Sequence, residues 1–145
     1  MNSKLNRKLG RKGFTMIELM VVVVVVGVLA TIAVPMYGKY IKNARVTEST
    51  SRIGELVTAS KSWAQENQDG SGSPIWPSAG GGIVDLTNSE SFSYAITSGG
   101  GADASATALE ITATGLAGTR MAGVSVTMTV PNLDSNGNPA VVAGL

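Results

Sequence analysis

A single carboxylate interrupts the most apolar stretch of this chain. Glu18 is the only charged residue in FTMIELMVVVVVVGVLATIAVPM, the segment from Phe14 to Met36. An acidic side chain costs about 2.5 to 3.5 kcal/mol at the centre of a membrane-spanning helix and less near an interface, so we expect a cationic partner for it. The alternative is an incidental acidic residue near a helix N-terminus, where the helix dipole favours negative charge.

Few other side chains could carry out chemistry. The chain has no Cys and no His, which excludes thiolate nucleophiles, Cys/His zinc sites, disulfides and imidazole acid–base catalysis. Ser60 and Lys61 are adjacent on an expected helix and face different directions, so they make a poor nucleophile–base pair. Asp134, Asn136 and Asn138 offer oxygen ligands at a spacing that suits calcium. However, the distal bidentate glutamate is missing, and an Asn-Gly turn explains the segment equally well. We expect no enzymatic activity and no cofactor.

The basic residues are concentrated at the N-terminus. The formal net charge is +1, with 11 basic and 10 acidic residues, but five of the basic residues precede Gly13. Beyond Gly13 there are 6 basic and 10 acidic side chains, which disfavours a nucleic-acid site because phosphate binding depends on clustered Lys and Arg. Residues 1–13 (MNSKLNRKLGRKG) have no periodic apolar face and are interpreted as a leader.

The apolar segment that contains Glu18 is long enough to cross a membrane. At about 1.5 Å per residue, residues 14–36 would span roughly the 30 Å hydrocarbon layer. Its six consecutive valines favour a strand in water, but in lipid every backbone amide must be bonded internally, so a helix is expected. The basic leader predicts a cytoplasmic N-terminus and an exported C-terminus. Gly27 and Pro35 interrupt the regular sequence, and Pro35 predicts a kink or a weakly bonded stretch just before it.

Residues 37–67 continue the helix with a different character. One face is apolar, and we expect it to belong to the core. Nothing between Lys39 and Gln68 is a proline, so we predict one nearly continuous helix from about Phe14 to Asn67. The residues on the apolar face are Ile53, Leu56, Val57, Ser60, Trp63 and Ala64.

Residues 68–145 predict a small β-rich head. Asp69–Gly82 (DGSGSPIWPSAGGG) is turn and loop sequence that ends the helix. Apolar and polar residues then alternate in three runs at 92–97, 109–114 and 124–130, which indicates antiparallel strands. Three strands with one apolar face need a partner, and the helix face around Ile53 and Trp63 supplies it. The expected fold class is therefore α+β.

The segment Gly13-Phe14-Thr15-Met16-Ile17-Glu18-Leu19 follows a basic leader and precedes an unbroken apolar run. It resembles the cleavage and methylation signature of type IV pilins and type II secretion pseudopilins, closely over residues 1 to about 45. The resemblance implies a long helix packed on a small sheet, with a glutamate and a proline where Glu18 and Pro35 lie. The chain differs from many pilins because it lacks the cysteine pair that closes a C-terminal loop.

The resemblance also implies how the protein is processed. A prepilin peptidase and methyltransferase would cleave after Gly13 and methylate the new amine of Phe14. The precursor would contact membrane lipid as a single-pass protein of the inner (cytoplasmic) membrane. An inner-membrane assembly machinery would then build a homopolymer outside the cell, for adhesion, motility or DNA uptake. The new Phe14 amine, its own or a neighbour's, is the nearest candidate cation for Glu18, so the pair would set the register of an entering subunit.

Alternatives stay open at this point. The first is a pseudopilin of a type II secretion system. The second is a secretory signal cleaved at Thr31-Ile32-Ala33, which would release a soluble protein beginning at Val34. A permanent single-pass anchor or a secreted binding protein is a third. Pro35 could also be an incidental bend, since proline is tolerated in membrane helices.

Overall fold

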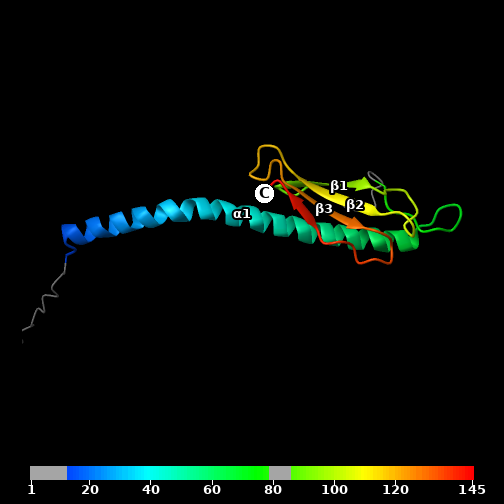
Figure 1. Cartoon of the computed structure of the whole chain (residues 1–145), viewed down its shortest axis with the longest axis horizontal. Helices are drawn as coiled ribbons and strands as arrows, with labels where there is room; N and C mark the ends of the chain where they lie inside the picture. Colours follow the sequence, from blue (N-terminus) through cyan, green and yellow to red (C-terminus); the bar gives the residue numbers. More distant parts are fainter. Residues whose placement is uncertain (1–12, 79–85) are drawn as a thin grey trace, which may run out of the picture. The chain divides into compact units, whose positions relative to one another are not determined.

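The computed structural model describes residues 13–78 and 86–145. Within them lie one helix, α1 (Met16–Glu66), and four strands that form one sheet, so the expected α+β class is confirmed (Figure 1). The chain divides into two units, Met1–Gly38 and Lys39–Leu145. The predicted leader, residues 1–13, lies outside the described residues except for Gly13.

The first unit contains the N-terminal part of α1. The helix continues through Gly27 and Pro35, and no side chain from Met16 to Met36 is buried. Because Pro35 has no N–H, the carbonyl of Thr31 loses its usual helical donor. The Thr31 hydroxyl also bonds locally, donating to the Val28 carbonyl oxygen at 2.7 Å. The kink expected before Pro35 stays a prediction.

The second unit begins with the rest of α1, which now has a buried face. Its buried residues recur every three or four positions, as a helix packed on one side requires. Trp63 departs from the prediction because it is only half-buried. The predicted face is otherwise confirmed and extends to two earlier residues. The buried set is Val46, Ser49, Ile53, Leu56, Val57, Ser60 and Ala64.

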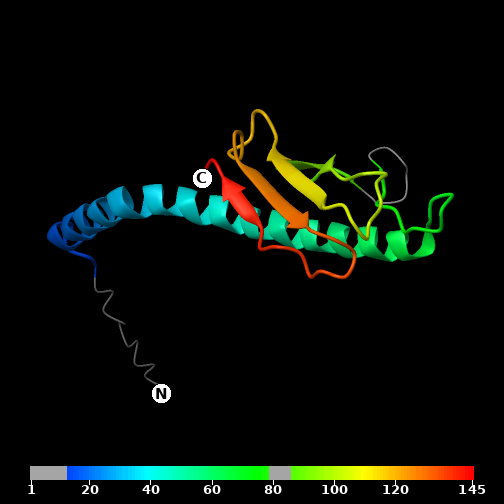
Figure 2. The same ribbon diagram turned by 45° about the vertical axis from the view of Figure 1, so that its right-hand side comes forward.

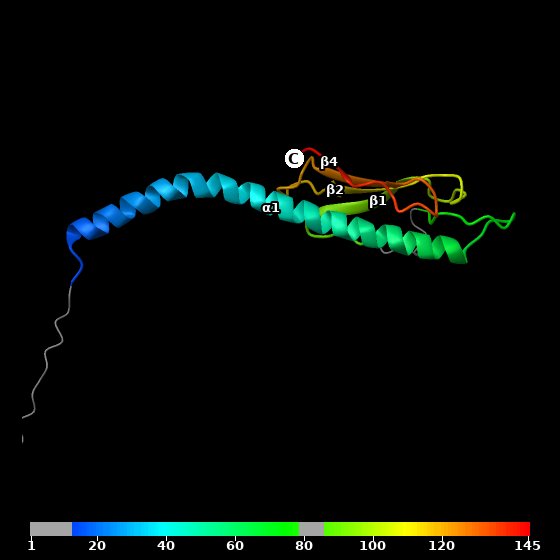
Figure 3. The same ribbon diagram turned by 60° about the horizontal axis from the view of Figure 1, so that its bottom comes forward.

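The sheet is an antiparallel meander that lies along this part of the helix. Its strands are β1 (Phe92–Ser98), β2 (Leu109–Gly115), β3 (Ser125–Val130) and β4 (Val141–Ala143), in the spatial order β1-β2-β3-β4. Figure 2 shows the sheet facing the helix, and Figure 3 shows the strands as a single layer above it. The three predicted runs are confirmed. The fourth strand was not predicted, because three residues are too few to show an alternation.

Alternation within the strands sends one set of side chains into the core. Phe92 and Tyr94 of β1, Leu109 and Ile111 of β2, and Val126 of β3 are all buried. On the opposite face, hydroxyls pair across the strands, as with Thr112 Oγ1 and Thr127 Oγ1 at 3.0 Å. The head therefore has one layer of core between helix and sheet.

The segment after α1 contributes more to the core than its sequence indicated. Trp76 has no exposed surface, although it lies in a stretch predicted to be loop. Its indole Nε1–H donates to the Thr107 carbonyl oxygen at 2.7 Å, and its backbone N–H donates to Ala102 at 2.9 Å. A buried indole is stabilised when its N–H finds a partner. Trp76, rather than Trp63, is therefore the core tryptophan.

Candidate functional site

The peptide bond between Gly13 and Phe14 lies in exposed, non-helical chain. Residues 13–15 precede α1, and the Phe14 side chain is 86% exposed. No heavy atom lies within 4 Å of the position that a Cβ on Gly13 would occupy. A bond in a helix would have to unwind before a protease could bind it, whereas this bond is already free of helical hydrogen bonds. Its position suits proteolytic processing.

Glu18 caps the start of α1 together with Thr15. The Thr15 backbone N–H and hydroxyl donate to Glu18 Oε2 at 2.9 and 2.8 Å, and the Glu18 N–H donates to Thr15 Oγ1 at 3.3 Å. This reciprocal arrangement is a capping box, which satisfies backbone donors that a helix N-terminus leaves unpaired. The sequence pattern for it, Thr-x-x-Glu, is present in residues 15–18, but the cap was not predicted from it.

The cap does not use the whole carboxylate. Both bonds from Thr15 go to Oε2 of Glu18, so Oε1 can accept a further donor. In the uncleaved chain Phe14 carries an amide nitrogen and no charge. The expected pairing of Glu18 with a Phe14 amine therefore requires cleavage first, and it stays a prediction.

The apolar side chains of the first unit cover the helix on every side. They are between 49% and 86% exposed from Phe14 to Tyr37. One window of α1 has a mean hydropathy of 2.8 and none of it is buried, so by length and composition this helix could cross a membrane. A surface of this size is far larger than the apolar patches that monomeric soluble proteins expose. It indicates burial in lipid or against other chains.

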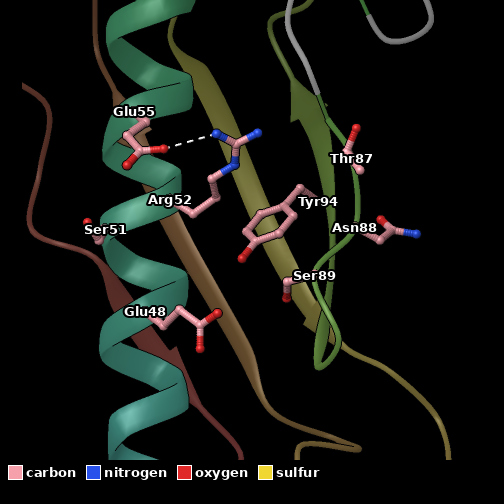
Figure 4. Close-up of a pocket in the computed structure, with 8 residues that line it drawn as sticks. All are labelled: Glu48, Ser51, Arg52, Glu55, Thr87, Asn88, Ser89 and Tyr94. Carbon is pink, nitrogen blue, oxygen red and sulfur yellow. Dashed lines mark hydrogen bonds and ion pairs between the residues drawn. The ribbon is translucent and has the colours of Figure 1, made fainter.

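The head contains a polar groove between α1 and the segment that leads into β1 (Figure 4). Its volume is about 510 Å³. Arg52 Nη1 lies 2.9 Å from Glu55 Oε2, and Arg45 pairs with Glu48 at 3.0 Å and with Glu90 at 3.4 Å. The hydrogen bond and the charge of Glu48 raise the pKa of the Arg45 guanidinium. The lining residues are Glu48, Ser51, Arg52, Glu55, Thr87, Asn88, Ser89 and Tyr94.

Two of these ion pairs lie within α1 and one connects α1 to the segment before β1, and they do not form a catalytic arrangement. Each groove carboxylate on α1 already has an arginine partner. The Arg45–Glu90 pair connects α1 to the start of β1 across 45 positions of sequence. Exposed pairs of this kind contribute little stability, about 0 to 1 kcal/mol. The groove therefore offers no activated nucleophile or acid–base pair.

The loop proposed from sequence as a calcium candidate is contacted by a lysine ammonium from α1. Lys61 of α1 donates to the carbonyl oxygen of Ser135, between Asp134 and Asn136. The Ser135 N–H in turn donates to Asn132 Oδ1 at 2.9 Å. Among the residues that the structure describes, no three acidic side chains gather as a metal site. Ser60, the neighbour of Lys61, donates to the Leu56 carbonyl oxygen instead, so the two do not act together.

A family model matches the N-terminal region of the chain. Residues 8–34 match the prokaryotic N-terminal methylation motif. The match includes Gly13, Phe14 and Glu18, and it ends just before Pro35.

Comparison with curated proteins extends the likeness into the head. The chain is 35% identical over 120 residues to the type IV major fimbrial protein FimA of Dichelobacter nodosus, covering 67% of this chain and 75% of that protein. It is 44% identical to a fimbrial protein of Pseudomonas aeruginosa, over 41% of this chain and 38% of that protein. It is 38% identical to the type IV major pilin protein PilE1 of Neisseria gonorrhoeae, over 44% of this chain and 33% of that protein. The matches thus span well under half of the Pseudomonas and Neisseria proteins. No solved structure matches the chain.

Proposed function

This chain belongs to the type IV pilin family, and we propose that it is a structural subunit that polymerises into a type IV pilus. The observation that carries the proposal is the exposed apolar surface of the segment from Phe14 to Met36. Such a surface is stable in lipid, but outside the cell it must be covered. Packing against the same segment of other copies covers it without a different partner.

We propose that the precursor is a single-pass protein of the cytoplasmic membrane, with the basic leader inside and the head outside. Five basic residues precede Gly13, which favours this orientation. Cleavage removes those charges and leaves the apolar segment attached to the head. The machinery of the cytoplasmic membrane would then transfer the segment from lipid to the filament.

Cleavage after Gly13 and methylation of Phe14 are the proposed processing steps. The exposed, non-helical position of the Gly13–Phe14 bond supports them, as does the family motif over residues 8–34. Gly13→Leu should leave the precursor uncut, because a bulky side chain obstructs the protease at the membrane surface. Mass spectrometry of the purified protein tests this, and processed protein in the variant would contradict it. Wild-type protein should begin at methylated Phe14.

We propose that the mature Phe14 amine pairs with Glu18 of a neighbouring subunit and so selects the register of assembly. The carboxylate keeps one oxygen available beyond its cap. A charge pair in a low-dielectric surrounding is strong and strongly distance-dependent, so subunits that align the pair would be favoured over those that do not.

Glu18→Ala should leave membrane insertion intact and reduce filament growth severely. Thr15→Ala is the matched control, because it removes the cap from the same helical turn and keeps the carboxylate. Electron microscopy of surface filaments, with membrane fractionation, measures both effects. Filaments of normal length from Glu18→Ala would contradict the pairing, and equal defects in the two variants would assign the effect to the cap.

The function itself is tested by deleting the gene and by analysing purified surface filaments. A pilus subunit should be the main component of the filaments, and its deletion should remove them. Surface filaments that persist in the deletion strain, together with failed export of a secreted enzyme, would instead indicate a pseudopilin. Native protein that begins at Val34, or that stays a monomer outside the cell, would contradict a filament subunit altogether.

A further inference from the structure

One end of the head is defined by where its strands begin and end. Phe92, at the start of β1, pairs with Gly115 at the end of β2. Thr114 pairs with Ser125 at the start of β3, and Ser125 pairs with Ala143 in β4. The Arg45–Glu90 ion pair places this end of the sheet beside the beginning of the head's helical stretch. We call this end, with helix residues 39–45 and the loop 116–124, the head base (Figures 1 and 2).

The head base is where the head's basic residues gather. Lys39, Lys42 and Arg45 lie on its helix, and Arg120 lies in its loop, so the base holds four of the six basic residues of residues 39–145. Glu90 is the acidic residue among the described loop residues of the base, and Arg45 is paired with it and with Glu48. Among the described residues, no acidic side chain pairs with Lys39, Lys42 or Arg120, so these three carry the positive charge of the base.

The opposite end of the head has the opposite charge. Lys61 lies at this end, bonded to Ser135, but five acidic residues outnumber it in the end of α1, the far ends of the strands and the loops there: Glu66, Asp69, Asp103, Glu110 and Asp134. The Ser71 hydroxyl and the Ser73 and Ser71 N–H groups hold the pKa of Asp69 below its usual value, which keeps that carboxylate charged. The head is thus polarised, with a basic base and an acidic far end.

The head base also carries an exposed aromatic ring. Tyr40 is 66% exposed, although its neighbour Ile41 is half-buried. Tyr40 lies about one helical turn after Met36, the last residue of the apolar segment. Tyrosine rings flanking a span are enriched at the level of the lipid headgroups, where one end is apolar and the other wet. Lysine stems reach the same layer while the ammonium stays in water.

We propose that the head base binds anionic phospholipid headgroups at the outer face of the membrane before the subunit enters a filament. The inference rests on the proposed membrane-embedded precursor. Lys39, Tyr40 and Lys42 continue directly from the apolar segment, so covalent connectivity holds them at the headgroup layer. Each Lys or Arg near an anionic surface strengthens binding about fivefold.

This contact would position the head before assembly. The anionic surface repels the acidic far end and attracts the base, so both forces turn the base of the head toward the membrane. Extraction into the filament would then have to break the contact between the base and the lipid. A second copy offering its acidic far end is the competing occupant of the base, and the experiment below separates the two.

The test uses the full chain in phosphatidylcholine vesicles with and without phosphatidylglycerol. Because the sequence has no Cys, one introduced cysteine carries a fluorophore at a single place. Ala117→Cys reports on the base and Ala106→Cys on the far end, and both positions are exposed. Val24→Cys reports on the apolar segment. Quenching by aqueous iodide measures how well each label is shielded.

We expect phosphatidylglycerol to lower quenching at position 117 at least twofold and to leave position 106 unchanged. The double variant Lys39→Gln/Arg120→Gln should lose the difference at 117. The matched control Ser62→Glu/Gln65→Glu changes the net charge equally at exposed positions outside the base, and it should keep the difference. Raising the salt concentration should weaken the effect, because screening shortens the reach of surface charges to a few ångströms.

Three results would overturn the proposal. Equal quenching at 117 in both vesicles is the first, and a difference that survives Lys39→Gln/Arg120→Gln is the second. The third is shielding at 117 that rises with protein density and not with phosphatidylglycerol, which would assign the base to a neighbouring copy. The label at position 24 separates these from failure of the precursor hypothesis. If position 24 is quenched in both vesicles, the chain is not membrane-embedded, and the proposed function fails as well.

Discussion

The two stretches of α1 belong to one helix and differ in what surrounds them. From Met16 to Tyr37 every side chain is exposed, whereas from Lys39 to Glu66 seven side chains are buried against the rest of the head. The first stretch is richer in large apolar residues, yet it is the second that forms the core. Hydrophobicity alone therefore does not decide burial. Burial requires a complementary surface, which the sheet gives only to the second stretch.

The difference follows from how apolar residues are distributed around the helix. In the first stretch valine, leucine and isoleucine occupy all sides, as in a helix surrounded by lipid or by other helices. In the second they share one face with small residues such as Ser49 and Ser60, while charged residues such as Glu55 face outward. Small residues let the sheet approach closely. The Ser49 hydroxyl is buried without a partner among the described residues, which fits a position selected for size.

Truncating the core tryptophan should have the largest effect on the head. Trp76→Ala should lower the free energy of unfolding by about 3 to 5 kcal/mol, because it leaves a cavity and an unpaired Thr107 carbonyl. Denaturation of the detergent-solubilised full chain, followed by Trp63 fluorescence, measures it. Trp63→Ala, followed by Trp76, is the control and should cost clearly less. Equal losses of unfolding free energy in the two variants would mean that the difference in burial between Trp76 and Trp63 does not decide how much each stabilises the head.

Matched valines test the comparison between the two stretches directly. Val126→Ala removes a fully buried side chain and should cost about 2 kcal/mol of head stability. Val24→Ala, at a position 66% exposed, should change head stability by less than about 0.5 kcal/mol. If residue 24 packs against other copies, Val24→Ala should lower the filament yield more than Val126→Ala does. A stability loss at 24 as large as that at 126 would break the comparison.

Removing the lysine ammonium that α1 donates to the 132–138 loop should have a moderate effect. Lys61→Met keeps the apolar stem but loses the bond to the Ser135 carbonyl, at a cost of about 1 to 2 kcal/mol. Hydrogen exchange should accelerate at Ser135 and Asn136 and stay unchanged in β2. Calcium should not raise the melting temperature of the wild-type head, since the ammonium already supplies a cation there. A clear calcium-dependent increase would support the calcium site instead.

Removing the helix cap should have the smallest effect. Thr15→Ala should cost about 1 kcal/mol locally and speed amide exchange in the first turn, residues 16–19, without lowering head stability. The two stretches would then respond independently, as expected for distant sites. Thr15→Ser is the conservative control, because it retains the hydroxyl. A lower melting temperature of the head in Thr15→Ala would show that the first stretch is coupled to it.

The sequence determined the elements whose signals are local. The unbroken apolar run, the spacing from Ile53 to Ala64 and the alternation from Val124 to Val130 each specify one element and its buried face. The processing motif around Gly13 and Phe14 could also be identified, because its residues are consecutive. The Thr15–Glu18 cap could likewise have been predicted, because its Thr-x-x-Glu pattern is local.

Tertiary structure alone decided the features that depend on residues far apart in the chain. Val141–Ala143 forms a strand only because β3 presents an open edge, and Trp76 becomes core only because the Ala102 and Thr107 carbonyl oxygens accept its backbone and indole N–H groups. Lys61 meets Ser135 across 74 positions, and Arg45 meets Glu90 across 45. Such pairings depend on the folded path of the backbone, and no short window of sequence contains both partners.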